Sequence, residues 1–362
     1  MRHDDHGLSR RQALGLAALG GANLVLPGTA FGQAPKDVKI LLSSASPNFA
    51  WAVSYAAGEL GYYKDEGLNI ERIPNNTGPG ALTALVAGAG HVDLSTPGEL
   101  LVAVTRGQKM KILMALSNYS SLYLSLSKEY AEKVGISENM PLAQKQEAAK
   151  KFKGIKIGIT SPGSQTDVTT RLILKNAGLD PAVDAELIPL GSTQNSLAAM
   201  GKGSIDGFMS SAPIPEFAAA QLGAVNAISV AKDEVPGLKE AVGHATLARA
   251  VDVEQQPDLF AALIRADVRA LRYIVENPKE ASDVVYRARY NSIIKPDLWP
   301  TVWDNNRSQF RTPYVTPKSV EAWVTMGLLP GVTDPKAVDA ANVVDMRFVD
   351  QAVKKLGWTV PA

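Results

Sequence analysis

The chain has 362 residues, with 37 Lys and Arg residues, 36 Asp and Glu residues and no cysteine. Its length exceeds the roughly 100–200 residues of one ordinary domain and predicts one large or two coupled globular units, while 46% hydrophobic and 20% charged residues exclude a largely disordered chain. The net charge of +1 excludes a strong field for nucleic acid or anionic membranes, and the missing cysteine excludes disulfides, thiolate nucleophiles and cysteine-ligated zinc or Fe–S clusters.

The amino terminus has the order of an export signal. A polar, charged start leads to the pair Arg10-Arg11, then to an uncharged run of Ala, Gly and Leu, and then to small residues ending at Gly32. Paired arginines before a mildly apolar run are typical of a twin-arginine signal cleaved at small residues. The run is shorter than the roughly 20 residues that span a bilayer, which disfavours an uncleaved anchor. We predict a signal peptide over residues 1–32, whose removal leaves 34 basic and 34 acidic residues.

The body of the chain alternates strand and helix patterns. This alternation predicts a parallel α/β sheet, in which ligands gather at the carboxyl ends of strands. The expected elements in chain order are a strand at 38–42, a helical stretch at 51–66, a strand at 69–73, a loop at 74–80, a helix at 81–87 and a strand at 91–94.

The same unit recurs later in the chain. Both copies open with a lysine-flanked strand, residues 39–43 and residues 156–160, and both continue through an Ile-Pro pair to an apolar residue followed by Asp. The interval is 19 residues from Pro74 to Asp93 and 17 residues from Pro189 to Asp206. A chance match of short apolar patterns is the alternative, but several features recur in one order. We therefore predict two similar α/β lobes.

Two further patterns predict that the chain crosses between these lobes twice. Residues 111–117 and 122–127 are apolar strands in near tandem, and residues 244–248 form a later strand candidate. Beyond Asp252 the spacing of apolar residues is helical, over 257–276 and again over 278–289. The result is a two-lobed molecule with two crossover strands, a discontinuous first lobe and a helical C-terminal tail.

With these features in place, the sequence resembles the periplasmic solute-binding proteins of ABC importers, in the nitrate, sulfonate, taurine and thiamine-precursor group. The resemblance rests on residues 59–68, with Tyr63 where the family usually has Phe, and on residues 84–93, 152–159 and 174–179. It covers most of residues 38–345 and says almost nothing about the ligand.

The resemblance implies a type II periplasmic-binding-protein clamshell of the α/β class. We expect a discontinuous lobe 1 over residues 33–120 and 241–362, and a lobe 2 over residues 121–240. Such a protein captures a small organic solute between its lobes and delivers it to an ABC permease with its ATPase. The solute classes left open are sulfonate, carboxylate, aromatic and pyrimidine-like. We expect a monomer without cofactor or nucleic acid.

In this family the ligand lies between the lobes, held by loops at the carboxyl ends of strands. In this chain those loops are residues 43–51, 77–80, 95–99, 160–167 and 210–213, with Tyr119 near a crossover. The candidate ligand-contacting residues are Ser44, Asn48, Phe49, Trp51, Thr77, Gly78, Thr96, Glu99, Tyr119, Ser161, Gly163, Ser164, Gln165, Thr166, Ser210 and Ser211.

The loop from Ser161 to Thr166 is the most informative of these. Small residues let the backbone approach a ligand, and free N–H groups at a helix start attract an anion. The alternative is a plain helix cap made by Ser164 or Thr166, and capping is compatible with binding.

Several side chains in the other loops also have two interpretations. Phe49, Trp51 and Tyr119 either form flat walls against a ligand or pack in the core. Glu99 either faces the cleft, where it favours a cationic or donor-bearing group, or lies exposed on the surface. No arginine falls in these loops, and Arg106 and Arg171 are the nearest, so a bidentate clamp on a strongly acidic ligand is not evident.

Enzymes on the same fold are the main functional alternative. The related pyrimidine synthases and sulfinate desulfinases depend on cysteine, which this chain lacks. Beyond the signal the histidines are His91 and His244, neither adjacent in sequence to a serine or an acid, and there is no G-x-S-x-G, P-loop or H-E-x-x-H motif. We therefore expect no catalytic residues and no metal site. A sensor or binding module without a transporter is a third possibility that sequence does not separate from the first.

Overall fold

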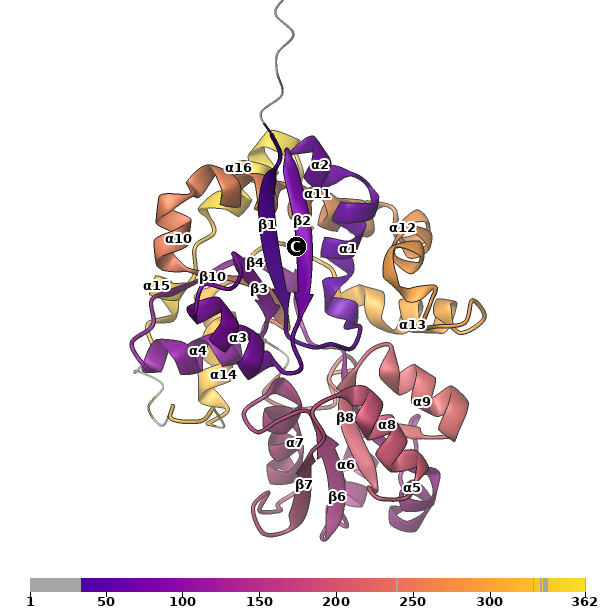
Figure 1. Ribbon diagram of the computed structural model, residues 1–362. Coiled ribbons are helices and arrows are strands. Elements are labelled where there is room, and N and C mark those ends of the chain that lie inside the picture. Colours follow the sequence, from indigo (N-terminus) through magenta and orange to yellow (C-terminus); the bar gives the residue numbers. More distant parts are fainter. Residues whose placement is uncertain (1–33, 239, 328, 333, 335–337, 362) are drawn as a thin grey trace, which may run out of the picture. The chain divides into compact units, whose positions relative to one another are not determined.

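The computed structural model describes residues 34–361 except residues 239, 328, 333 and 335–337 (Figure 1). The predicted signal over residues 1–32 lies outside the described residues. The described part of the chain contains two five-stranded sheets, both within a compact unit that begins at Pro35. Sheet 1 has the order β2 (Leu68–Pro74), β1 (Lys36–Leu42), β3 (Val92–Ser95), β10 (His244–Arg249) and β4 (Met110–Ser117). Sheet 2 has the order β7 (Ala185–Pro189), β6 (Ile155–Ile159), β8 (Gly207–Ser211), β5 (Leu122–Leu126) and β9 (Val225–Ser229).

The two sheets have the same topology. In each, the second strand in the order pairs in parallel with both neighbours, β1 with β2 and β3, and β6 with β7 and β8. In each, the fourth strand is antiparallel to the strands beside it: β10 in sheet 1 and β5 in sheet 2. The chain passes between the sheets through residues 118–121 and returns through residues 230–243. The predictions of two similar α/β units and two crossings are therefore confirmed.

The register corrects one detail of the predicted repeat. His91, not Asp93, is the counterpart of Asp206. The backbone N–H of Lys39 donates to His91 Nδ1 at 3.0 Å, as that of Lys156 donates to Asp206 Oδ2 at 2.8 Å. With this pairing, the interval from the Ile-Pro pair to His91 equals the interval from the second Ile-Pro pair to Asp206. Phe208 then takes the place equivalent to Asp93. The sequence pattern suggested the wrong pair because His replaces the acidic residue in the first copy.

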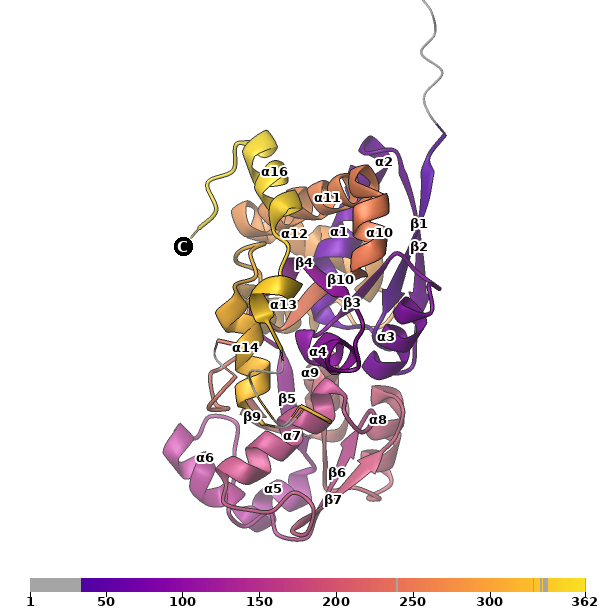
Figure 2. The ribbon, with the colours of Figure 1, turned by 90° about the vertical axis from the view of Figure 1, so that its left-hand side faces the viewer.

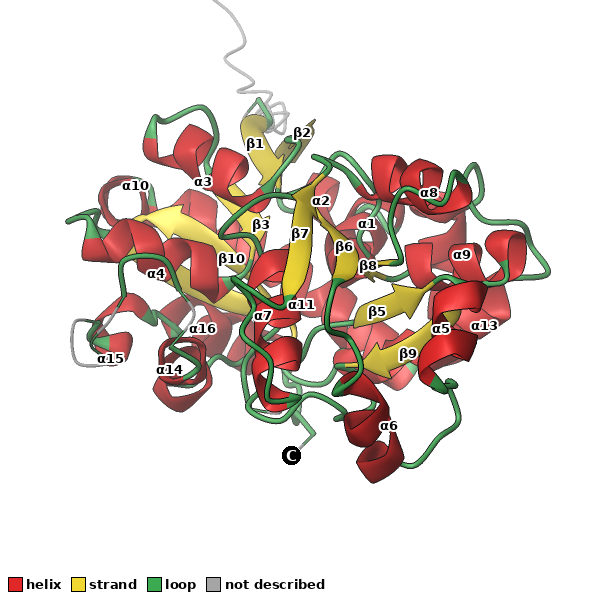
Figure 3. Cartoon of the chain, turned by 90° about the horizontal axis from the view of Figure 1, so that it is seen from below, coloured by secondary structure: helices red, strands yellow, loops and turns green. Residues whose placement is uncertain are grey.

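Helices flank both sheets. The helices between the strands of sheet 1 are η1 (Phe49–Trp51), α1 (Ala52–Glu59), α2 (Tyr62–Asp65), α3 (Gly78–Val86) and α4 (Pro97–Thr105). Those between the strands of sheet 2 are α5 (Lys128–Val134), α6 (Leu142–Ala149), α7 (Gln165–Asn176), α8 (Thr193–Gly201) and α9 (Ile214–Leu222). Figure 3 shows α5 beside β9. The expected helical stretch at 51–66 is broken, because Gly61 adopts a left-handed φ of 75° between α1 and α2.

The chain after β10 is helical, as predicted. Its elements are α10 (Ala250–Gln255), α11 (Pro257–Glu276), α12 (Pro278–Val285), the π-helical turn η2 (Tyr286–Tyr290), α13 (Trp299–Asn306), η3 (Arg307–Gln309), α14 (Pro317–Thr325), α15 (Ala340–Val343) and α16 (Arg347–Leu356). Helix α11 contacts α1 and α16, and Figure 2 shows α11 and α16 together. Among the described residues, no helix is long and apolar enough to cross a membrane.

The core of sheet 1 follows from the alternation of strand side chains. Val38, Ile40 and Leu42 pack against α1 and α11 on one face, while Leu41 belongs to the apolar cluster on the other face. Each fully buried aliphatic side chain contributes roughly 1.5–3 kcal/mol relative to exposure. Burial of both faces fixes where the strands end and therefore where their loops lie.

Candidate functional site

Loops that follow the strands of sheet 1 contact loops and helix starts of sheet 2. Thr193 Oγ1, in the first turn of α8, donates to Ser46 Oγ at 2.7 Å, and the hydroxyl of Ser46 also bonds to the Gln194 side chain. The backbone N–H of Phe49 donates to the carbonyl of Ala212 at 3.0 Å. We call the zone in which these loops and helix starts meet the junction. It lies at the carboxyl ends of parallel strands, where α/β sheets place their ligands.

Glu99 lies in the junction, where helix starts from both sheets meet. Its carboxylate accepts hydrogen bonds from the backbone N–H of Thr96 at 3.0 Å and from Ser95 Oγ at 3.2 Å, and it also bonds to the Thr96 hydroxyl. The backbone N–H of Gln165, at the start of α7, also acts on this carboxyl and lowers its pKa. A Cβ added at Gly78, in the first turn of α3, would lie 2.3 Å from Glu99 Oε1.

The environment of Glu99 is nearly closed to solvent. The residue is 5% exposed, so the alternative of surface exposure is wrong. Burial raises the pKa of its carboxyl to about 7, although the N–H and hydroxyl donors oppose this rise. Beside it lies a cavity of about 320 Å³ with apolar walls from α3 and α4, lined also by Arg106 and Gly163. A carboxyl group of this chain therefore occupies the helix start that was expected to attract an anion.

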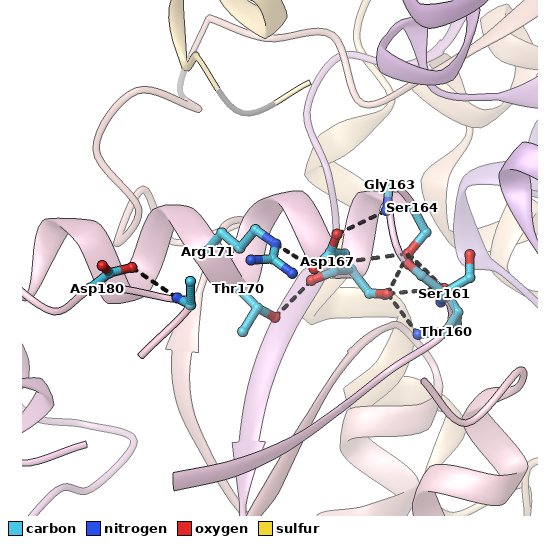
Figure 4. A network of polar contacts seen from close by, with 10 residues as sticks. Thr160, Ser161, Gly163, Ser164, Asp167, Thr170, Arg171 and Asp180 are labelled. Carbon is cyan, nitrogen blue, oxygen red and sulfur yellow. Dashed lines mark hydrogen bonds and ion pairs between the residues drawn. The ribbon is translucent and has the colours of Figure 1, made fainter. Parts of the chain in front are cut away.

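The loop before α7 is a network of hydroxyl groups (Figure 4). Ser164 is the N-cap of α7, which confirms the predicted capping role. Its hydroxyl donates to the carbonyl of Ser161 at 2.7 Å and accepts from Thr160 Oγ1 at 2.9 Å. Thr166 Oγ1 accepts from the Thr160 N–H at 2.9 Å. Arg171 forms an ion pair with Asp167 within α7 at 2.7 Å, so its charge is already partnered.

Replacing Ser164 with Ala should lower stability without removing the fold. The cap and its hydroxyl bonds would be lost, at a cost of about 1 kcal/mol. Thermal and urea unfolding, followed by circular dichroism, measure the change. Ser204→Ala, at an exposed residue outside the junction, is the matched control and should leave the midpoint unchanged. Equal midpoints for Ser164→Ala and wild type would show that the hydroxyl does not cap α7.

The first loop of sheet 1 places its predicted residues in two environments. Ser44 and Trp51 line a second cavity, of about 280 Å³. Trp51 is buried and its indole N–H donates to the carbonyl of Leu94 at 3.1 Å. Asn48 caps η1 through a bond from the Ala50 N–H, and its Nδ2 lies 3.1 Å from His244 Nε2.

Two predicted residues have side chains that contact other parts of the chain than the junction loops. Phe49 has its ring in an aromatic cluster with Tyr290, Trp303 and Phe310, at centroid distances of 5.5–6.1 Å. This is the core position that was the alternative interpretation of its sequence. The Tyr119 hydroxyl bonds to Ser308 in η3, on the side of the C-terminal helices.

Among the described residues, several buried polar atoms on or beside the junction loops and the two connections lack a hydrogen-bond partner, as do others elsewhere, on Thr169, Thr246 and Gln309. Ser210 Oγ, Ser121 Oγ, Ser161 Oγ and His244 Nδ1 have no hydrogen-bond partner among the described residues. Buried polar groups in folded proteins are nearly always paired with protein, water or ligand. Burial lowers the pKa of His244 to about 4, which keeps its ring neutral at pH 7. The junction therefore offers neutral donors and acceptors to a molecule that enters it.

The sequence-based interpretation missed several junction residues. Thr193 and Gln194 follow Ser192, the N-cap of α8, just as Gly78 follows Thr77, the N-cap of α3. The internal repeat could therefore have predicted that Thr193 and Gln194 belong to the junction. Arg72 and Arg289 line the cavity of about 280 Å³ beside the first loop. Nothing in the sequence near either arginine indicates this, because tertiary packing alone brings η2 to the first loop.

The described residues contain no group of three or more His, Asp or Glu side chains placed to hold a metal ion. Glu216, in the first turn of α9, accepts from Asn306 Nδ2 at 2.7 Å, and burial raises the pKa of its carboxyl to about 7. Asn306 belongs to α13, so this bond also joins a helix of the second unit to the C-terminal helices.

Comparison with solved structures places this architecture among known folds. A protein of Bordetella bronchiseptica RB50 is 20% identical, with a TM-score of 0.75 over 90% of this chain and 99% of its own. The periplasmic nitrate-binding protein NrtA of Synechocystis PCC 6803 is 19% identical, with a TM-score of 0.70 over 91% of each chain. A putative periplasmic sulfonate-binding protein of Methylobacillus flagellatus KT is 19% identical, with a TM-score of 0.64 over 91% of this chain and 98% of its own.

These structural similarities establish the two-lobed α/β fold with a helical C-terminal region. No curated protein sequence matches the chain significantly. The sequence profile of the NMT1-like family matches residues 46–288, which is more than half of the chain. This match confirms the resemblance seen in the sequence motifs, and it covers every strand of both sheets except β1. The chain belongs to the NMT1-like family.

Proposed function

We propose that this protein is the periplasmic solute-binding component of an ABC importer. It captures a small organic solute at the junction and delivers it to a permease with its ATPase. The observation that carries the proposal is that buried polar atoms of Ser121, Ser161, Ser210 and His244, which lie on or beside the junction loops and the connections, have no hydrogen-bond partner among the described residues. A solute with matching polar groups would satisfy them. The nitrate- and sulfonate-binding proteins of the same fold support this proposal.

The two connections supply a mechanism for capture. We assign lobe 1 to residues 33–120 and 241–362 and lobe 2 to residues 121–240, so that both boundaries fall within the connections 118–121 and 230–243. Bending there would open the junction, and a solute that contacts both sheets would stabilise the closed state. The closed protein would then present surfaces from both lobes to the permease.

The proposal also includes a location in the cell. Residues 1–32 act as a twin-arginine signal, and the mature chain works as a monomer in the periplasm. Because it carries as many basic as acidic residues, attraction for a solute has to come from local groups rather than from the net charge. The residues that contact the solute belong to the predicted loops, with Ser46, Thr193 and Gln194 added from the structure.

A thermal-shift series tests binding against catalysis. The mature protein is heated with taurine, nitrate, benzoate or a methylpyrimidine, and each mixture is examined by mass spectrometry for products. A solute at 100 times its Kd should add about 2.7 kcal/mol of stability and be recovered unchanged. Ser164→Ala combined with Thr166→Ala should weaken that gain while the unliganded protein stays folded. Turnover of the stabilising compound would contradict the binder and support the enzymatic alternative.

A sensor without a transporter would give the same thermal shifts. Binding of the loaded protein to vesicles that contain its permease and ATPase, with uptake of labelled solute, separates the two. We expect uptake to require the loaded protein. Uptake that is independent of it would leave the protein as a binding module alone.

A further inference from the structure

The cavity beside the first loop of sheet 1 is lined by two arginines and, among the described residues, by no acidic residue. It has a volume of about 280 Å³ and lies at the carboxyl ends of β1 and β2, whose last residues Leu42 and Pro74 are paired and both line it. Arg72 comes from β2 and Arg289 from η2. Its size is close to the lower end of the range for small-molecule sites.

Neither arginine is held in a direct ion pair among the described residues, although the charge of Arg72 opposes the rise in the pKa of the buried Asp267 carboxyl. Arg72 and Arg289 are half-buried, and neither forms an ion pair with any residue that the structure describes. Arg72 is held in place: its Nη2 donates to the Ser54 carbonyl at 2.5 Å, and its guanidinium lies 5.2 Å from the ring centroid of Tyr55. Its Nε is buried and has no partner among the described residues. A half-buried, unpaired guanidinium favours a carboxylate or sulfonate, to which it can donate two parallel hydrogen bonds.

The rest of the lining suits the body of an organic molecule. Trp51 and Tyr55 provide aromatic surface, and both are fixed by the core. Ser44 and Ser46 also line the cavity, and the Ser46 hydroxyl bonds to Thr193 and Gln194 of α8. A molecule in this cavity therefore lies next to a direct contact between the two sheets.

We propose that this cavity is an anion subsite of the junction, in which Arg72 and Arg289 hold the carboxylate or sulfonate of a small organic acid against Trp51 and Tyr55. The inference rests on the proposed solute-binding function and names the charge class of the solute. It also changes the expectation from sequence. No arginine falls in the predicted loops, so the sequence alone offered no reason to expect an acidic ligand. Arg289 is the better residue to vary, because Arg72 also supports α1 through Ser54.

Calorimetric titration of the mature protein with four matched probes tests this subsite. The probes are benzoate and benzenesulfonate, which are anionic, benzamide, which is neutral, and benzylamine, which is cationic. We expect binding of at least one anion and none of the other two. Arg289→Ala should weaken that binding at least tenfold, and Arg289→Lys should retain part of it. The control is Arg287→Ala on the same turn, whose exposed side chain pairs with Glu59, and it should bind as wild type does.

The outcomes separate this inference from the proposed function. Anion binding that is unchanged by Arg289→Ala, in a variant with wild-type circular dichroism, overturns the subsite and leaves the binder standing. Binding of benzamide or benzylamine in preference to the anions does the same. If none of the four binds, the solute retained on purification or regained from an extract of the native medium decides. A neutral or cationic solute overturns the subsite, and an organic anion whose binding is lost in Arg289→Ala supports it. No solute from either source overturns both proposals.

Discussion

Replacing Gly243 with Ala should destabilise the protein by roughly 1–3 kcal/mol or more, the usual cost of forcing extra atoms into a packed site. Gly243 ends the second connection between the sheets, and its N–H donates to the Ser117 carbonyl at 3.0 Å. A Cβ there would lie 2.3 Å from the carbonyl oxygen of Tyr119, in the first connection. Because that neighbour is backbone, the two connections would have to separate.

Urea unfolding of Gly243→Ala at 25 °C measures this cost. The control is Gly201→Ala at the end of α8, where the nearest atom to a new Cβ, on Leu222, is 3.8 Å away. Alanine is the better helix former by up to about 1 kcal/mol, so the control should be as stable as wild type or more so. A Gly243→Ala variant as stable as the control would mean that the two connections do not pack this closely.

Replacing Asp93 with Asn should stabilise the protein at pH 8 and change nothing at about pH 4. Asp93 lies on β3 between Leu41 and Leu247, and neither of its carboxyl oxygens has a hydrogen-bond partner among the described residues. Burial, with Glu99 nearby, raises the pKa of Asp93 well above its usual value. The unfolded chain loses this proton near pH 3.9, whereas the folded protein keeps it, so wild type loses stability relative to the variant as the pH rises.

The size of this effect follows from linkage. The difference should grow by about 1.4 kcal/mol for each pH unit over which only the folded state holds the proton. Paired urea titrations of wild type and variant from pH 4 to pH 8 give the slope. Asp297→Asn, at an exposed loop residue, is the control and should show no such trend. If the difference in the free energy of unfolding between Asp93→Asn and wild type does not change with pH, the Asp93 carboxyl is not buried without a hydrogen-bond partner.

The sequence predicted the elements whose signals are local. The helix expected over residues 257–276 is α11, because apolar spacing and a proline at its start define it. The helical stretch at 51–66 failed at Gly61, where a glycine that looks tolerable in a helix takes a left-handed φ. The repeat was visible, but its register was set by backbone bonds to His91 and Asp206 that no residue pattern showed.

The candidate site was predictable only in part, for the same reason. Thr96 and Glu99 have the spacing of a capping box, which would have predicted that the Glu99 carboxyl turns back on its own helix. Its further contact with the start of α7 depends on how the two sheets meet, and so does the bond between Ser46 and Thr193. Arg289 reaches the first loop across more than two hundred residues of chain, so its place in the junction could come only from the fold.

Native mass spectrometry of the freshly purified mature protein tests the central claim most directly, since that claim is the reversible capture of one small solute. We predict a complex heavier than the apoprotein by the mass of a single small molecule, which is released intact when the protein is unfolded and is bound again by the refolded chain. A protein that carries no such molecule, and that neither regains one from an extract of its native medium nor is stabilised by that extract, would contradict the account.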